Sequence, residues 1–135
     1  MHFFASPEAN DYQTINFGER INMKKIEAYI KASRLNEVIE QLHEIEGLTG
    51  VSTFAMHGFG RTRDSNKPVR IMDVSLSSRP HVKLEIMCHD DLAELVVSTI
   101  TTAAHTGLRG DGKVYISSLE QAIRIATGER GETAL

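Results

Sequence analysis

Residues 82–88, with the sequence VKLEIMC, alternate between two kinds of side chain, since Val, Leu and Ile are separated by Lys and Glu. Successive side chains of a β-strand point to opposite faces, so this pattern predicts a strand with one face in a hydrophobic core. Asp90 and Asp91 then favour the start of a helix, through capping and the helix dipole. Apolar residues recur after them at helical spacing, at positions 92, 95, 96, 100 and 103. The stretch therefore predicts a strand that leads into an amphipathic helix.

The rest of the chain repeats this order of elements. The predicted elements are a strand at 23–31, a helix at 35–45 that stops before Gly47, a strand at 49–57 and a strand that begins with Val114 and Ile116. Residues 118–126 are expected to form a short helical turn and then a final edge strand. The order is therefore β-α-β, a long connection, and β-α-β.

Two β-α-β units with right-handed crossovers pack as a four-stranded antiparallel sheet with helices on one face. The sequence thus predicts an α+β, ferredoxin-like fold. The other face of the sheet is left open, and it needs a ligand, a nucleic acid or another subunit to cover it. RNA-binding proteins of this fold place aromatic residues on their central strands, whereas residues 82–88 contain none. Burial against another subunit is the better interpretation.

Composition is that of one ordinary globular domain, with 135 residues, 41% hydrophobic and 24% charged. The formal net charge of −3 argues against a general nucleic-acid binder. Cys88 is the sole cysteine, which excludes an internal disulfide and a thiolate metal cluster. The apolar runs are too short to cross a membrane. A cytoplasmic protein is expected.

The expected domain boundaries follow the change in pattern near Met23. Residues 1–22 show neither strand nor helix periodicity, and we predict a flexible N-terminal extension or an over-extended start of the reading frame. An ordered arm that reaches a partner is the alternative. Residues 23–129 are expected to form the domain, and residues 130–135 a C-terminal tail.

The run TGLRGDGK at 106–113 suggests a phosphate site. Its glycines adopt positive φ at little cost, so several backbone N–H groups can converge on one point beside Lys113. Phosphate oxygens suit such a nest. A glycine-rich turn that binds nothing is the alternative for this run taken alone.

The connection between the second and third strands, from Gly58 to Pro80, is unusually long and basic. Loops of this length in a small domain are functional or disordered. Gly58 and Gly60 provide hinges at its base, and Arg61 provides a fork-shaped phosphate donor. A mobile effector loop is therefore predicted, with a solvated hairpin extension as the alternative.

Several motifs together resemble the PII signal-transduction proteins. They are MKKIEA at 23–28, LTGV at 48–51, GFGR at 58–61, VKLEI at 82–86, TGxxGDGK at 106–113 and IRIxTGE at 123–129. The resemblance implies a ferredoxin-like subunit, a homotrimer and an adenine nucleotide (ADP, AMP or ATP) in each cleft between subunits. It also implies a long T-loop that controls partner proteins, such as an ammonium or bicarbonate transporter or a metabolic enzyme.

The resemblance also assigns roles to single residues. Gly110, Asp111, Gly112 and Lys113 would contact phosphates. Gly58, Gly60 and Arg61 would lie at the T-loop base, Ser52 and Met87 would line the adenosine pocket, and Arg124 would reach in from the neighbouring subunit. Arg63, Arg79 and His81 are expected to contribute to effector binding at the T-loop.

The chain departs from the family pattern at positions that carry regulation. Val74 stands at the modified tyrosine position and Met72 at the phosphorylated serine position, so covalent control is expected to be lost. Thr62 replaces the glutamine that helps to hold magnesium and 2-oxoglutarate, which makes both effectors doubtful. His81 is a pH-dependent charge where a cation is usual, and Ala126 replaces an arginine. Fewer cations favour shorter nucleotides over ATP.

Alternative functions remain open at this point. A carbon-side variant would sense bicarbonate together with ADP or AMP. A slow nucleotide hydrolase would use Lys113 and Arg61 on phosphate, and a trimeric metal-tolerance protein has a related fold. Cys88, His89 and Asp90 form no catalytic trio, because neighbours on a strand face opposite ways. The histidines show no metal-ligand spacing, so no catalytic or metal site is predicted.

Overall fold

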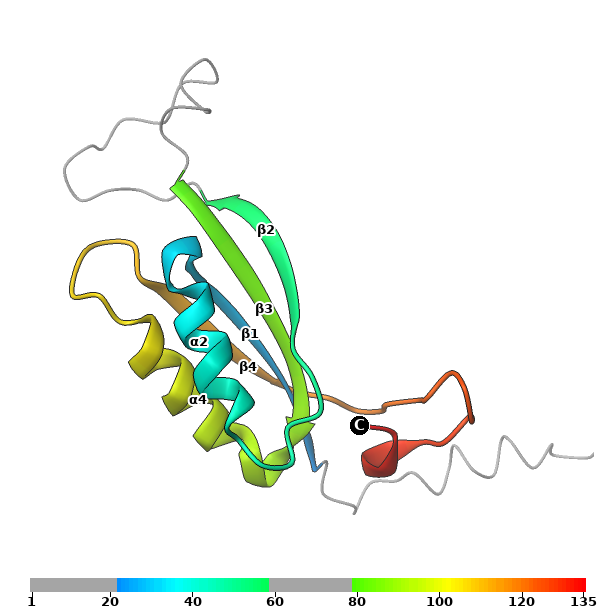
Figure 1. The fold of residues 1–135 in the computed structure, drawn as a ribbon. Coiled ribbons are helices and arrows are strands. Elements are labelled where there is room, and N and C mark those ends of the chain that lie inside the picture. Colours follow the sequence, from blue (N-terminus) through cyan, green and yellow to red (C-terminus); the bar gives the residue numbers. More distant parts are fainter. Residues whose placement is uncertain (1–21, 59–78) are drawn as a thin grey trace, which may run out of the picture.

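A computed structural model describes residues 22–58 and 79–135 of the chain. The elements follow the order β1 (Met23–Lys31), a 3-10 turn (Ala32–Arg34), α2 (Leu35–His43), β2 (Ser52–Gly58), β3 (Arg79–His89), α4 (Asp90–Ala104), β4 (Gly112–Ser118) and a second 3-10 turn (Gly131–Ala134). In Figure 1, α2 and α4 lie side by side against one face of the sheet. The predicted β-α-β, β-α-β order is confirmed.

Within the described residues, four strands form one antiparallel sheet in the order β2-β3-β1-β4. The central strands pair so that Ile26 lies opposite Ile86, and on its other side β1 places the same residue opposite Ile116. This is the ferredoxin-like arrangement that the sequence predicts.

The core lies between the sheet and the helices. Its fully buried side chains come from β1, β3, α2 and α4, namely Ile26, Ile30, Leu84, Ile86, Val38, Leu42, Val96 and Ile100. Each such side chain stabilises the fold by about 1.5–3 kcal/mol relative to its exposed state. The apolar side chains of the alternating strands therefore face the helices.

Some predicted boundaries are wrong by a few residues. Helix α2 ends at His43, although Ile45 in the following turn is still buried. At the start of α4 the N-cap position is taken by His89, so Asp90 and Asp91 contribute through the helix dipole from the first turn.

The prediction for residues 118–126 is wrong. Strand β4 continues through Ser118, and the segment beyond it carries an isolated bridge between Ile123 and Arg130 and no helical turn. This segment runs past the end of the sheet (Figure 1), where no strand of the described chain lies beside it. Ile125 is fully exposed there, so the alternation of Ile123 and Ile125 has no sheet to pair with.

The residues just before and just after the predicted domain also make contacts. The Asn22 carbonyl accepts a hydrogen bond of 2.7 Å from the Asp90 N–H, and Gly131 N–H donates to the Ala122 carbonyl at 2.9 Å. The segment after residue 129 therefore contacts the segment that precedes it. Residues 1–21 lie outside the described part.

Candidate functional site

The candidate site lies at the end of the sheet where β1 stops, β3 starts and the α4–β4 loop (residues 105–111) crosses over. Strand pairing places Lys31 opposite His81 and Gly58 opposite Arg79 at this end. The His81 Nε2 atom lies 3.4 Å from the Gly110 carbonyl oxygen. The structure therefore brings the start of β3 against the glycine-rich loop.

Backbone conformation explains the glycines of this loop. Gly107, Gly110 and Gly112 have φ values of +79°, +80° and +106°, a region that other residues rarely adopt. A Cβ atom on Gly112 would lie 1.6 Å from the Tyr29 carbonyl oxygen. Position 112 therefore requires glycine for two reasons. Its φ is positive, and β4 approaches β1 too closely there for a side chain.

The Asp111 carboxylate closes the loop from inside. It accepts hydrogen bonds from the Thr106 N–H at 2.9 Å, from the Thr106 hydroxyl and from the Gly107 N–H at 3.3 Å. The Thr106 Oγ1 atom in turn accepts a bond of 3.1 Å from the Leu108 N–H. The first half of the loop therefore uses its N–H groups internally, and this leaves residues 110–113 as the segment to test for phosphate contacts.

Charge also stabilises this carboxylate. The Lys31 Nζ atom lies 3.1 Å from Asp111 Oδ1. The pKa of Asp111 is held well below its usual value, first by the Thr106 hydroxyl, then by the Thr106 N–H and further by Lys31. Asp111 is therefore an ionised structural acceptor near neutral pH.

Lys113 stands where the loop enters β4. It pairs with Tyr29 of β1 and is exposed. Strand alternation places it on the face of the sheet away from the helices, which we term the open face. Its ammonium group is thus presented beside the loop and not in the core.

The open face carries a network of charges at its centre. The Lys83 Nζ atom lies 2.7 Å from Glu85 and 3.1 Å from Glu27, while the Lys25 Nζ atom lies 3.3 Å from Glu27 and 4.0 Å from Glu85. Glu85 and then Glu27 raise the pKa of Lys83, and Lys83 is the main cause that lowers the pKa of Glu27. The network is balanced, with two cations facing two anions.

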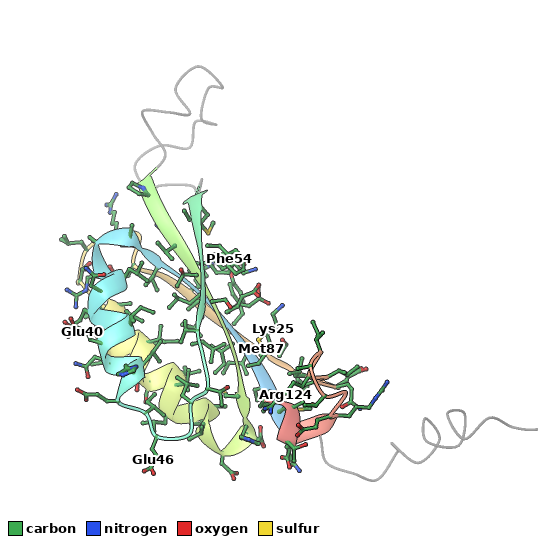
Figure 2. All side chains as sticks on the ribbon, turned by 45° about the vertical axis from the view of Figure 1, so that its right-hand side comes forward. Lys25, Glu40, Glu46, Phe54, Met87 and Arg124 are labelled. Carbon is green, nitrogen blue, oxygen red and sulfur yellow. The ribbon has the colours of Figure 1, made fainter. Side chains whose placement is uncertain are left out.

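Aromatic side chains surround these charges. The rings of Tyr29 and Tyr115 meet edge to face with centroids 5.7 Å apart, and Lys83 Nζ lies 5.9 Å from the centroids of both Tyr29 and Phe54. Figure 2 shows Phe54, Lys25 and Met87 on the side of the sheet away from the helices. Residues 82–88 contain no aromatic side chain, but Tyr29, which was not among the predicted residues, lies on the other central strand, β1. In the alternating residues 23–31, Tyr29 stands between the apolar Ala28 and Ile30, and this position could have predicted that its ring lies on the open face.

Arg124 lies at the opposite end of the molecule from the glycine-rich loop (Figures 1 and 2). Its guanidinium group donates to the carbonyls of Thr133 and Leu135, at 3.3 Å each, and lies 3.6 Å from the Glu129 carboxylate. One chain therefore does not bring Arg124 to the loop.

The remaining predicted site residues divide by position. Ser52 and Met87 lie on the open face, with Ser52 opposite Glu85 and Met87 opposite Lys25. Glu85 is four positions along β3 from His81, so Ser52 is about 13 Å from the loop end of the sheet. The other predicted residues, Gly60, Arg61, Thr62, Arg63, Met72 and Val74, lie outside the described part of the chain.

Two further observations concern the described residues alone. His, Cys, Asp and Glu side chains form no group of three suited to a metal ion there. In the same part of the chain, no helix combines the length and the apolar character needed to cross a membrane.

Comparison with known proteins identifies the family. Residues 23–129 match the family model described as nitrogen regulatory protein P-II. The chain belongs to the PII family. Relatives include the nitrogen regulatory proteins P-II of Rhodospirillum rubrum, 45% identical, and Azospirillum brasilense, 42% identical, each over 113 residues that cover 84% of this chain and 100% of the relative.

Solved structures support the PII fold. A crystal structure of Arabidopsis thaliana PII bound to citrate superposes with a TM-score of 0.69 at 32% identity, over 88% of this chain and 97% of that one. A B. subtilis GlnK–ATP complex superposes with a TM-score of 0.70 at 24% identity, over 87% and 100%. The family is described as regulatory, and the predicted ferredoxin-like fold is that of its solved members.

We predict that Gly112→Ala destabilises the protein by at least about 2 kcal/mol, because the new Cβ atom collides with the Tyr29 carbonyl and φ becomes strained. Urea unfolding at fixed protein concentration measures the change. Gly50→Ala is the matched control, since open space surrounds Gly50, and it should stay within about 0.5 kcal/mol of wild type. Equal losses in both variants would contradict the steric argument.

Asp111→Asn should destabilise the protein at pH 7 and by a smaller but still substantial amount at pH 3. The pKa of Asp111 is lowered in the folded state. Its stabilisation is therefore fully present above the unfolded value, about 4, and declines as the pH falls below it toward the folded pKa. Denaturant unfolding at both pH values tests this, with the exposed Glu46→Gln as control. An Asp111→Asn effect that is independent of pH refutes the assignment.

Proposed function

We propose that this PII protein binds an adenine nucleotide, with the phosphates at residues 110–113, and regulates partner proteins through the 58–80 connection. The observation that carries this proposal is the glycine-rich loop, which Asp111 closes from inside beside the exposed Lys113. A nest of backbone N–H groups next to a lysine suits phosphate oxygens. The GlnK–ATP complex supports it, since a protein of this fold holds ATP.

A complete site requires a second subunit. Arg124 lies at the end of the molecule opposite the loop (Figure 2), so it can approach the loop of another copy and not its own. The open face, with its balanced charges and aromatic rings, supplies a surface for such contacts. We infer a homotrimer with a nucleotide in each cleft between subunits, Ser52 and Met87 against the adenosine, and Arg124 from the neighbour.

The proposed preference among ADP, AMP and ATP depends on how many cationic side chains reach the phosphates. Lys113, Arg61 and Arg124 each offer a charge-assisted hydrogen bond, worth about 1.5–3 kcal/mol. Ala126 lacks a guanidinium group, so one triphosphate contact is lost. ADP or AMP is therefore favoured relative to ATP.

The regulatory output is proposed for the connection that joins β2 to β3. Gly58 and Arg79 pair at its two ends, and His81 touches Gly110, so a ligand on the loop sits at the root of this connection. A transporter of ammonium or bicarbonate, or a metabolic enzyme, is the proposed partner class.

Val74 excludes tyrosine modification at that position, and Thr62 reduces or removes the 2-oxoglutarate response. A cytoplasmic location is part of the same proposal.

Calorimetry with ADP tests the site. Lys113→Met and Arg124→Met should each weaken binding by about 10- to 100-fold, the loss of one charge-assisted hydrogen bond. Lys24→Met serves as control, because Lys24 pairs with Asp90 at the other end of β1. Sedimentation should show a trimer for every variant. Wild-type affinity in both site variants refutes the assignment, and steady phosphate release from ATP and magnesium contradicts a regulator without turnover.

Bicarbonate is tested in the same system. If the chain is a carbon-side variant, bicarbonate titrated into the nucleotide-loaded protein should release heat and raise nucleotide affinity. If it produces neither effect, the bicarbonate variant is excluded while nucleotide binding stands.

A further inference from the structure

We propose that Lys31, at the end of β1, is a positioning residue for the phosphate-binding loop. Its ammonium group holds Asp111 and Thr106 together, and these three residues, which we term the loop staple, set the shape of residues 106–112. The inference rests on the proposed nucleotide site, because the same loop would contact the phosphates.

The staple joins the loop to the sheet. The Lys31 Nζ atom lies 3.1 Å from Asp111 Oδ1 and donates a 3.1 Å hydrogen bond to Thr106 Oγ1, across 75 positions of sequence. The side chains of Lys31 and Asp111 are only 15% and 24% exposed. Exposed ion pairs contribute little to stability, but this pair is half-buried, and the Thr106 hydroxyl contacts both of its charges.

The second half of the loop rests on the Lys31 side chain. A Cβ atom on Gly110 would lie 3.8 Å from Lys31 Cε, so the loop backbone passes over the end of the methylene chain. His81, the strand neighbour of Lys31, faces the Gly110 carbonyl. Lys31 therefore supports the loop through its aliphatic stem as well as through its charge.

Lys31 is placed to act through Asp111 and not as a phosphate ligand. Its ammonium group is committed to the carboxylate and the hydroxyl, whereas Lys113 is exposed on β4. Without Lys31, the loop would loosen and the Asp111 charge would face an incoming phosphate with less compensation. Both effects lower phosphate affinity and leave adenosine binding unchanged.

The experiment compares Lys31→Met, which keeps the stem and removes the charge, with Lys24→Met. Lys24 begins the same strand, and its Nζ atom lies 3.2 Å from Asp90 and 3.4 Å from Ser118 Oγ. Calorimetry should show ADP binding about tenfold weaker in Lys31→Met, within twofold of wild type in Lys24→Met, and adenosine binding equal in all three. Thr106→Val should reproduce the ADP-specific loss. Equal losses for ADP and adenosine would overturn the positioning role.

A double-variant comparison separates positioning from direct contact. If Lys31 acts through Asp111, then Lys31→Met should cost less than about threefold in ADP affinity when Asp111 is already Asn, because the two effects are not additive. If Lys31 binds phosphate itself, the tenfold loss persists in the Asp111→Asn background, and the inference is wrong.

Amide hydrogen exchange tests the staple without nucleotide. The Thr106 and Gly107 N–H groups donate to Asp111, so Lys31→Met should speed their exchange about tenfold while Lys24→Met leaves it unchanged. Unchanged exchange and normal ADP affinity in Lys31→Met would overturn this inference alone. Failure of the wild-type protein to bind any adenine nucleotide would overturn the proposed function and the positioning role together, even if the exchange result showed that the staple exists.

Discussion

The antiparallel pairing of β1 with β3 is the constraint on which the other features of this protein depend. Its register places Ile26 opposite Ile86 on the helix side and Glu27 opposite Glu85 on the open side. A shift of one residue would exchange these faces and expose the core. The same register sets Lys31 opposite His81, so the strand ends that hold the glycine-rich loop are fixed by the pairing that builds the core.

The loop shows how a polar cluster replaces a hydrophobic anchor at the edge of a small domain. Residues 105–110 are exposed, and apolar burial cannot hold them in one conformation. Instead the Asp111 carboxylate gathers two N–H groups, a hydroxyl and an ammonium group. A carboxylate with several donors is a strong acceptor, and this gives an exposed loop a defined shape before any ligand arrives.

The two parts of the proposed site lie at opposite ends of a single chain. The loop and Lys113 lie at one end of the sheet, and Arg124 lies with the C-terminal segment at the other. Exposed Ile123 and Ile125 and the charged open face fit a chain that completes its surface in an assembly. In the proposed trimer, nucleotide binding and subunit association would be coupled, because each subunit would supply Arg124 to the loop of its neighbour.

The sequence by itself determined the strand faces, the helices and the glycine-rich loop, because alternation, helical spacing and glycine content are local properties of consecutive residues. The motifs at 58–61, 106–113 and 123–129 also placed the chain in its family. The prediction from local patterns is wrong at residues 118–126. Apolar alternation there predicts an edge strand, but the segment runs beyond the end of the sheet.

Only the tertiary structure decided the contacts of Lys31, Asp111 and Tyr29. Asp111 belongs to the run predicted to contact phosphates, and the structure adds that its carboxylate faces inward to Thr106 and Lys31. Tyr29 meets Tyr115 because β4 pairs with β1. Contacts between residues so far apart in sequence depend on strand register and chain closure, and no local periodicity records them.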